Sequence, residues 1–472
     1  MLTAANELRA RLERLDSEIA HHEESLGLLR EARAGVVEQL RLEQLRGKDY
    51  PVLTLPFEIT SQIFIDSLLA EDENHAYPSP DQPPLVFTRV CRDWRTIALA
   101  TPTLWRQVRI DVDSDDGPGH LDSKWVALLD SWLHRSEPHP IDVSIGNRSY
   151  TDPDKTLVPV LNRYSERWRD VELHLPFSHF PLLNISALPL LERLTLSAHG
   201  SPDIINPISV FMHAPMLRHI SLEGGIYPSE ILLPWGQLTS LEMHGASASD
   251  CLDLVRTTPN LQTCILDIRS ASHGLVLAPP LLDLRSFTFS GPASWGTLRY
   301  LSLPALEHLD LTRIPPGNEP VDVLIFQPLQ RWQCRLRQLK LYVRTGSDSP
   351  LHLLSLLRYL SPTLEKLELM VADSSAGNLI FHEVVVDDRV LPQLTSVELR
   401  CMNDDNQRRL LDTVTAVLEK SPQETTRRIT QFSVFFDTET EGEFGAELEE
   451  RWQRLVASGV ELRVENLRMR WI

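Results

Sequence analysis

Apolar residues near the N-terminus recur on two seven-residue series. Their members are Leu8, Leu15, Leu29 and Val36 in one series, and Leu12, Ile19, Leu26 and Leu40 in the other. The spacing between the series alternates between four and three residues, which is the a/d seam of a heptad repeat. No proline falls within residues 6–45. The pattern therefore predicts a long helix over residues 1–47.

Two polar residues interrupt this seam, His22 in one series and Arg33 in the other. Two arrangements of the helix remain open. One is a parallel coiled-coil homodimer through residues 8–40, in which a polar seam residue can fix the register. The other is a solvated single helix that folds back on the next domain. Gly47 and Pro51 end the helix and form a short hinge.

Residues 51–110 follow a different pattern of short helical segments. Pro56 suits the first position of a helix, and Glu58 falls in the first turn, where the helix dipole favours a carboxylate. Ile59 and Ile63 are one turn apart on one face. Residues 71–84 contain four acids and four prolines, which predicts a loop.

Two further helices are predicted after this loop. The apolar positions that define them are Val86, Val90, Trp94 and Ile97 for the second helix, and Leu104, Trp105 and Val108 for the third. The three helices would share a small core around Trp94 and Trp105. We expect Trp94 and Ile63 to lie mainly in that core. The residues expected to face a partner are Leu55, Pro56, Ile59 and Leu104.

In order and spacing, residues 51–110 resemble an F-box. The residues that carry the resemblance are Leu55, Pro56, Glu58, Ile59, Ile63, Phe64, Val90, Cys91, Trp94, Leu104 and Trp105. The resemblance implies that they dock the small adaptor subunit of an SCF-type cullin–RING ubiquitin ligase, and through it a cullin. Cys91 is expected to be a small packing residue. The loop at residues 71–84 is longer than the usual link between F-box helices.

Residues 111–166 are predicted to connect this module to a repeat domain. Residues 123–134 have the pattern of a helix, and residues 141–145 alternate like a strand. The acidic residues 111–117 resemble the start of a calcium loop. However, the glycine and the twelfth position do not match the EF-hand pattern, so a solvated turn is expected.

An L-x-x-L-x-L-like pattern recurs from residue 167 to residue 472, at spacings of 21 to 35 residues. Self-similarity of this length predicts a solenoid of parallel strands. The pattern resembles irregular leucine-rich repeats. The consensus asparagine is replaced in the early units, by His199, Gly225, Ala246 and Arg269. Later units are long enough for helices at residues 351–359, 408–419 and 446–456, and residues 459–464 predict a closing strand.

The two-residue period of a strand assigns side chains to the open, concave face of this solenoid. The candidates for binding an unknown protein target are Arg193, His219, Glu223, Glu242, His244, Asp267, His308, Asp310, Lys340, Tyr342, Lys366 and Arg400. Between residues 170 and 310 this face carries six acids and one base. We expect this half to prefer a basic segment. The alternative is a solvated face that binds nothing.

Composition narrows the functional classes. A net charge of −19 with no long Lys/Arg run disfavours binding to nucleic acid or to an anionic membrane. The five cysteines form no C-x-x-C pair, which indicates free thiols in a reducing compartment. No segment has the roughly 18 apolar residues of a membrane span. We therefore expect a cytoplasmic or nuclear protein.

No catalytic, metal-binding or phosphate-binding motif stands out in the sequence. His382-Glu383 is followed by three valines instead of completing H-E-x-x-H, and the Gly-rich phosphate and nucleophile motifs do not occur. We expect no cofactor and no enzymatic activity. The predicted fold is α+α/β, with a heptad helix, a three-helix F-box-like module and a leucine-rich-repeat-like solenoid. The predicted function is a substrate receptor of a ubiquitin ligase, with a scaffold that joins no ligase as the alternative.

Overall fold

The computed structural model describes most of the chain. The described residues are 2–46, 55–69, 78–111, 123–146, 157–199, 207–272, 274–291, 295–311, 322–343, 350–371, 391–401, 407–419, 429–436 and 446–466. Residues 112–117 of the acidic stretch and residues 71–77 of the loop lie outside them. The chain divides into two compact units, residues 1–72 with 79–104, and residues 73–78 with 105–472.

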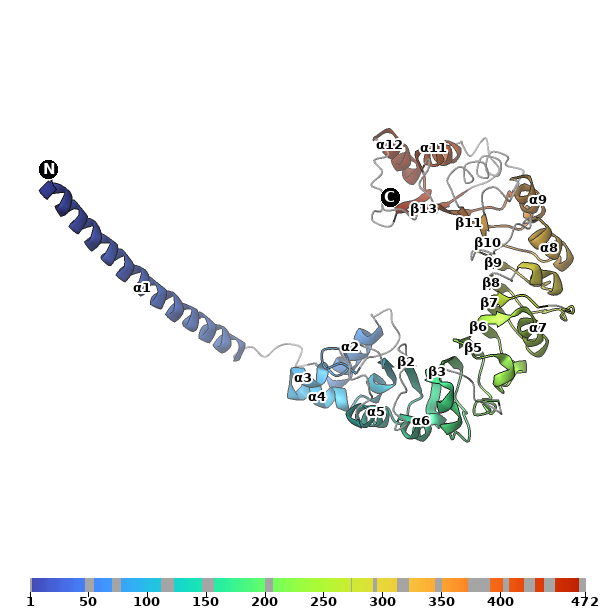
Figure 1. The fold of residues 1–472 in the computed structure, drawn as a ribbon, viewed down its shortest axis with the longest axis horizontal. Coiled ribbons are helices and arrows are strands. Elements are labelled where there is room, and N and C mark those ends of the chain that lie inside the picture. Colours follow the sequence, from blue (N-terminus) through green and yellow to red (C-terminus); the bar gives the residue numbers. More distant parts are fainter. Residues whose placement is uncertain are drawn as a thin grey trace. The chain divides into compact units, whose positions relative to one another are not determined.

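The first unit is helical (Figure 1). Its helices are α1 (Leu2–Arg46), α2 (Phe57–Leu69), α3 (Phe87–Val90) and α4 (Arg92–Leu99), followed by the 3-10 turn η2 (Pro102–Trp105). Helix α1 runs without a break through the segment that carries the heptad pattern. Helix α2 begins at Phe57, so Pro56 lies directly before the helix and not at its predicted first position. The carbonyl of Pro56 accepts the N–H of Thr60 at 3.1 Å.

The predicted second helix is interrupted at Cys91. This residue is extended, with φ −154° and ψ 174°, and its Sγ accepts the backbone N–H of Trp94 at 3.4 Å. An N-cap residue has an extended backbone, and its side chain accepts the backbone N–H of the residue three positions later. Cys91 therefore starts α4, a role that the expectation of simple packing missed. The break also turns Val90 outward, with 56% of the residue exposed.

Three aromatic rings form the core of the first unit. The rings of Phe64 and Phe87 stack at 4.2 Å between centroids, and Trp94 meets Phe64 edge-on at 4.9 Å. Offset and edge-on geometries are the favourable ones for aromatic pairs. Trp94 is thus a core residue, as predicted, whereas Phe87 was not predicted.

Two side chains have the opposite placement to the predicted one. Leu104 is only 1% exposed, although we expected it to face a partner, and Ile63 is 47% exposed, although we expected it in the core. Ile63 is exposed because α2 packs through another stripe of its surface, which contains the buried Thr60 and Phe64. Ile59 and Ile63 are also one turn apart, but they lie beside that stripe and face outward.

The second unit is built on one parallel sheet of fourteen strands that follow one another in sequence order (Figure 1). The strands are β1 (Gln107–Asp111), β2 (Ile141–Gly146), β3 (Trp168–Pro176), β4 (Arg193–His199), β5 (His219–Glu223), β6 (Ser240–Ser247), β7 (Thr263–Ser270), β8 (Ser286–Ser290), β9 (His308–Leu311), β10 (Gln338–Val343), β11 (Lys366–Val371), β12 (Ser396–Cys401), β13 (Gln431–Phe436) and β14 (Glu461–Asn466). Each strand pairs only with its neighbours in the chain. This order is that of an α/β solenoid, as the repeat pattern predicted.

The sheet begins earlier in the chain than predicted. Only η2 is left of the predicted third helix, and Val108 lies in β1, where it is buried. Trp105 belongs to the second unit, where its ring meets that of Trp132 edge-on at 4.9 Å. Strand β1 pairs in register with β2, so the predicted strand at residues 141–145 is the second in the sheet.

Helices and short turns connect the strands on one side of the sheet (Figure 1). The helices are α5 (Ser123–Arg135), α6 (Leu157–Tyr164), α7 (Ala248–Thr257), α8 (Gln327–Trp332), α9 (Pro350–Leu360), α11 (Gln407–Leu418) and α12 (Ala446–Ala457). The predicted helix at residues 123–134 and the three late helices are confirmed within a residue or two. In the described residues between β3 and β6, and between β7 and β9, the strands are connected by short 3-10 turns and extended segments instead of α-helices.

Every repeat buries the two apolar strand residues of its pattern. Leu339 and Leu341 of β10, for example, are fully buried, and they pair in register with Leu309 and Leu311 of β9. Two continuous rows of apolar side chains therefore run through the sheet. Because each row is completed by the neighbouring strand, no repeat buries its apolar face alone.

A continuous line of backbone hydrogen bonds, which we call the spine, runs beside these rows. At the residue before each strand from β4 to β12, one carbonyl accepts the N–H groups of two successive residues in the next repeat, at 2.8 to 3.2 Å. Arg218 and His219 both donate to Glu192 in this way. The accepting residues are Glu192, Arg218, Thr239, Gln262, Arg285, Glu307, Arg337, Glu365 and Thr395. Both lone pairs of each carbonyl are therefore used.

Truncation of one apolar row should destabilise the second unit. Phe287 and Phe289 are buried with ring centroids 5.0 Å apart. We expect Phe287→Ala to lower the free energy of unfolding by about 3–5 kcal/mol, because a large cavity is left in a packed row. Urea unfolding of the full chain measures this change. The neighbouring Thr288→Ala, on the opposite face, should change it by less than about 0.5 kcal/mol, and equal effects of the two variants would contradict the assignment of faces.

Candidate functional site

Outside α1, the described residues of the first unit expose six large apolar side chains, which we call the apolar set. They are Leu55, Phe57, Ile59, Ile63, Val90 and Leu99. Ile59 and Ile63 lie one turn apart on α2 and form its outward stripe. A small unit with this much exposed apolar surface is typical of a protein that binds another protein through it.

The residues predicted to bind an adaptor separate into two groups. Leu55, Ile59, Ile63 and Val90 belong to the exposed apolar set, and Pro56 and Glu58 are exposed beside them at the start of α2. The second group is structural. Its members are Phe64, Trp94, Leu104 and Trp105, which are packed, and Cys91, which caps α4.

Phe57 and Leu99 are members of the apolar set that were not predicted. Phe57 is the first residue of α2, where an apolar side chain has no helical neighbour before it. Leu99 ends α4, next to the buried Ala98. Both positions are at helix ends, where the 3.6-residue period has too few points to assign a face.

The face of the sheet turned away from the helices is the second candidate surface, here called the open face. All twelve predicted target-binding residues lie on its strands, β4 to β12. Strand register places several of them side by side, including Arg193 with His219, His244 with Asp267, and Asp310 with Lys340. Eleven of them are half-buried or exposed.

Tyr342 is the exception among the twelve. Only 7% of this residue is exposed, so it contributes little to a binding surface. In register it lies beside Met370 of β11. A large ring next to a long side chain on the same face is screened from water, which strand periodicity alone does not predict.

At the start of the open face the charged residues are tied together. Asp142 is buried, and Arg169 binds both its carboxylate oxygens, with Nε at 2.9 Å from Oδ1. Such a bidentate pair compensates the buried charge. On the next row, Ser144 Oγ donates to Glu172 at 2.6 Å, and Glu172 lies 2.7 Å from His174 Nε2.

The contact with His174 determines the protonation of Glu172. Hydrogen bonding from the imidazole lowers the pKa of Glu172 to about 2, and the hydroxyl of Ser144 acts in the same direction against the opposing effect of burial. Hydrogen bonds to the ionised form stabilise that form. The carboxylate is therefore a fixed negative group on the open face.

The other acids in this half have weaker partners. Glu242 lies 2.9 Å from His244 Nε2, and Asp170 lies 3.4 Å from Arg193. Glu223 is half-buried at the end of β5. The acidic character expected for residues 170–310 is thus partly reduced by ion pairs.

The later half of the open face carries alternating charges. Glu368 is nearly buried and lies between Lys340 at 2.7 Å and Lys366 at 2.8 Å. These lysines lower the pKa of Glu368 against the opposing effect of burial. Two of the predicted target-binding lysines are therefore engaged with a carboxylate of their own sheet.

An aromatic platform closes this half. Phe435 of β13 lies between Arg400 and Arg463, whose guanidinium carbons are 5.4 and 5.3 Å from the ring centroid. Cation–π contacts of this kind hold planar groups on both sides of a ring. Phe435 was not predicted on the open face, although the two-residue period of β13 places it there, beside the buried Val434 and Phe436.

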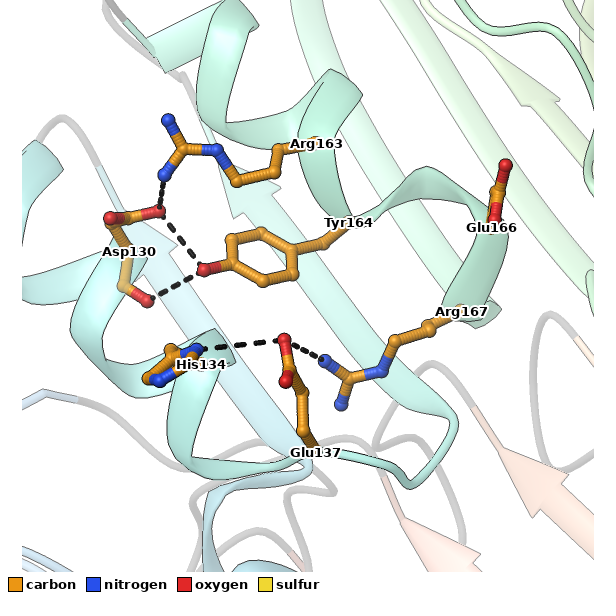
Figure 2. A pocket seen from close by; sticks show the side chains of 7 residues that line it. All are labelled: Asp130, His134, Glu137, Arg163, Tyr164, Glu166 and Arg167. Carbon is orange, nitrogen blue, oxygen red and sulfur yellow. Dashed lines mark hydrogen bonds and ion pairs between the residues drawn. The ribbon is translucent and has the colours of Figure 1, made fainter.

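A cavity of about 440 Å³ lies between α5 and α6 on the helical side of the second unit (Figure 2). Its lining residues are Asp130, His134, Glu137, Arg163, Tyr164, Glu166 and Arg167. Arg163 lies 2.6 Å from Asp130, and the Tyr164 hydroxyl donates to the same carboxylate at 3.0 Å. Burial is the main cause that raises the pKa of Tyr164.

Contacts within the cavity mainly join the two helices. Arg167 donates to the carbonyls of His139 and Leu133 at 2.7 and 3.1 Å, and Glu137 lies 3.7 Å away. None of the lining residues is a serine, threonine or cysteine. These contacts join α5 and the turn after it to α6 and the residues directly after α6. We assign no chemistry to the cavity.

Comparison with known proteins identifies no relative: no protein-family model and no curated protein matches the chain. Within the described residues, no three or more His, Cys, Asp or Glu side chains cluster as metal ligands would. In the same part of the chain, no helix combines the length and the apolar character that a membrane span requires.

Acid titration should reveal the contact between Glu172 and His174. The pKa of Glu172 is lowered on folding, so its stabilisation is complete above the unfolded value of 4.5 and is lost as pH falls towards about 2. We expect Glu172→Gln to flatten the fall in unfolding free energy between pH 5 and pH 2. Urea unfolding at each pH measures the slope. Glu449→Gln, on the exposed side of α12, should keep the wild-type slope, and parallel curves for Glu172→Gln and wild type would contradict the assignment.

Proposed function

We propose that this protein is a non-catalytic substrate receptor of an SCF-type cullin–RING ubiquitin ligase. The observation that carries the proposal is the apolar set on the first unit, where Leu55, Ile59 and Ile63 are exposed instead of packed. These residues belong to the stretch whose order and spacing resemble an F-box. An adaptor subunit that covers them would remove their apolar surface from water.

The proposed role of the protein is to hold two other proteins together. The first unit binds the adaptor, and the open face of the second unit binds the target. A target held in this way meets the ligase at a high effective concentration, which accelerates transfer by an enzyme elsewhere in the assembly. No catalytic residue is required in the receptor itself.

The open face suits a protein target better than a small ligand. Its polar residues are spread over many strands, from β2 to β14, in register rows instead of converging in one pocket. A parallel-strand solenoid with such a face also resembles irregular leucine-rich repeats, which use it for protein binding. In the first half, Glu172 and Glu242 favour a basic segment of the target.

A scaffold that joins no ligase is the second candidate function. The exposed apolar seam of α1 favours it, because that helix offers a further surface for protein contact. The two candidates differ in what the apolar set binds.

Replacement of the exposed apolar residues should abolish binding to the adaptor. We expect the double variant Ile59→Asp with Ile63→Asp to lose co-purification with the SCF adaptor subunit, because two charges would be buried without partners. Both side chains are about half exposed, so the first unit should still fold. Pull-down with the purified adaptor and circular dichroism test these two points.

The matched control adds a charge without removing apolar surface. Thr96→Asp on the exposed side of α4 should bind the adaptor like the wild type. If the wild-type protein folds but does not bind the adaptor, the scaffold becomes the better explanation. Leu104→Asp should unfold the first unit, since that residue is in the core.

Charge reversal should weaken binding of a basic segment to the open face. We expect Glu223→Lys with Glu242→Lys to reduce the affinity for a Lys/Arg-rich peptide by roughly tenfold, because attraction becomes repulsion. Fluorescence anisotropy at low salt measures the affinity. The variant Glu449→Lys with Glu450→Lys on α12 has the same net charge and should bind like the wild type. Equal losses in both variants would show that only net charge matters.

A further inference from the structure

Helix α1 carries a long apolar seam that faces water. Seven apolar residues of the heptad series are between 48% and 67% exposed: Leu12, Leu15, Ile19, Leu26, Leu29, Val36 and Leu40. A helix of 45 residues draws most of its stability from packing of its apolar stripe. The question is therefore which partner covers this seam.

We infer that a second copy of this chain covers the seam and that the two α1 helices run antiparallel. The proposed register places Leu26 of one copy against Leu29 of the other. It also aligns Ile19 with Val36, and Leu15 with Leu40. Each of these layers is apolar on both sides. The inference does not depend on the ligase assignment, because it concerns α1 alone.

The two polar seam residues, His22 and Arg33, decide the direction. In a parallel pair every seam residue faces its own equivalent, so Arg33 would lie against Arg33 of the second copy. Two guanidinium groups would then be held together in a partly desolvated seam. In the antiparallel register Arg33 faces His22 instead, and no two equivalent charges meet.

The same two residues also fix the register. In the proposed alignment His22 of each copy faces Arg33 of the other, so the dimer contains two such polar layers. All other layers between residues 15 and 40 are apolar. A shift by one heptad places Arg33 against Leu15 or Leu29, and His22 against Leu26 or Leu40. Four layers would then set a polar group against a leucine, and this desolvates the polar group without a partner.

Charges beside the seam have less influence on the direction. Arg11 and Asp16 would attract each other across a parallel dimer, as flanking positions do in coiled coils. Both side chains are exposed, and exposed ion pairs contribute little in water. In the antiparallel register Glu18 meets Gln39, and Asp16 meets Val37, so these two acids meet no like charge. The seam therefore outweighs the flanks.

An antiparallel pair has a geometric consequence that a parallel pair lacks. The two chains leave the coil at opposite ends, about 55 Å apart along its axis at 1.5 Å per residue. The parts of the two chains that follow α1 are then held well apart. The dimer would present two separate sets of binding surfaces instead of one crowded set.

Disulfide mapping in the full chain tests the direction. The double variant Leu15→Cys with Leu40→Cys places one thiol in each of two facing layers. After mild oxidation and trypsin digestion, the antiparallel pair joins the fragment of residues 15–30 to the fragment of residues 34–41. Fragments joined only to their own equivalents would overturn the antiparallel direction. A monomer by sedimentation at high micromolar concentration would overturn the pairing altogether.

A charge substitution gives an independent test without cross-linking. In the antiparallel register, His22→Glu places a carboxylate against Arg33 in two layers, so the dissociation constant of the dimer should fall about tenfold. In a parallel pair the same variant sets the two introduced carboxylates against each other and raises the dissociation constant. Ser17→Glu adds a carboxylate on the outer side of α1 and should leave the dissociation constant unchanged. Weaker dimerisation of His22→Glu by sedimentation equilibrium would contradict the proposal.

Discussion

A backbone carbonyl that accepts two N–H groups from the next repeat is the interaction on which the second unit depends. It recurs from Glu192 to Thr395 and joins each repeat to the one before it at the same point. Main-chain N–H groups supply this contact at each of these positions. The backbone itself keeps the strands in register, and the apolar rows of the strands pack beside it.

The sequence predicted those parts of the fold that repeat. Leu336, Leu339 and Leu341 mark one unit, and the same spacing before and after it identifies parallel strands. Single breaks were harder to predict. Cys91 divides a helix because its extended backbone caps α4, and Val108 joins the sheet although its apolar spacing suits a helix. A local cap at Cys91 and strand pairing at Val108 overrule short patterns that have too few points to be specific.

On the open face, position and exposure were easier to predict than side-chain contacts. Strand periodicity placed all twelve open-face residues on the correct strands, but it could not show that Glu368 would engage Lys340 and Lys366. In the first unit the motif contained both surface and core residues. Ile63 is exposed and Leu104 is buried there, which is the reverse of the prediction. The recurring residues of a motif do not show which side of a helix is packed.

Because of the spine, many side chains of the open face can be substituted without loss of the fold. The hydrogen bonds of the spine involve backbone atoms, and the buried rows occupy alternate positions, so outward side chains that lack a charged partner contribute little to the stability of the sheet. Thr195, Ser221 and Thr288 can be replaced without loss of register. Natural variation can therefore rewrite what this surface recognises while the scaffold beneath it stays the same, and directed evolution of new binding specificities should begin at these positions.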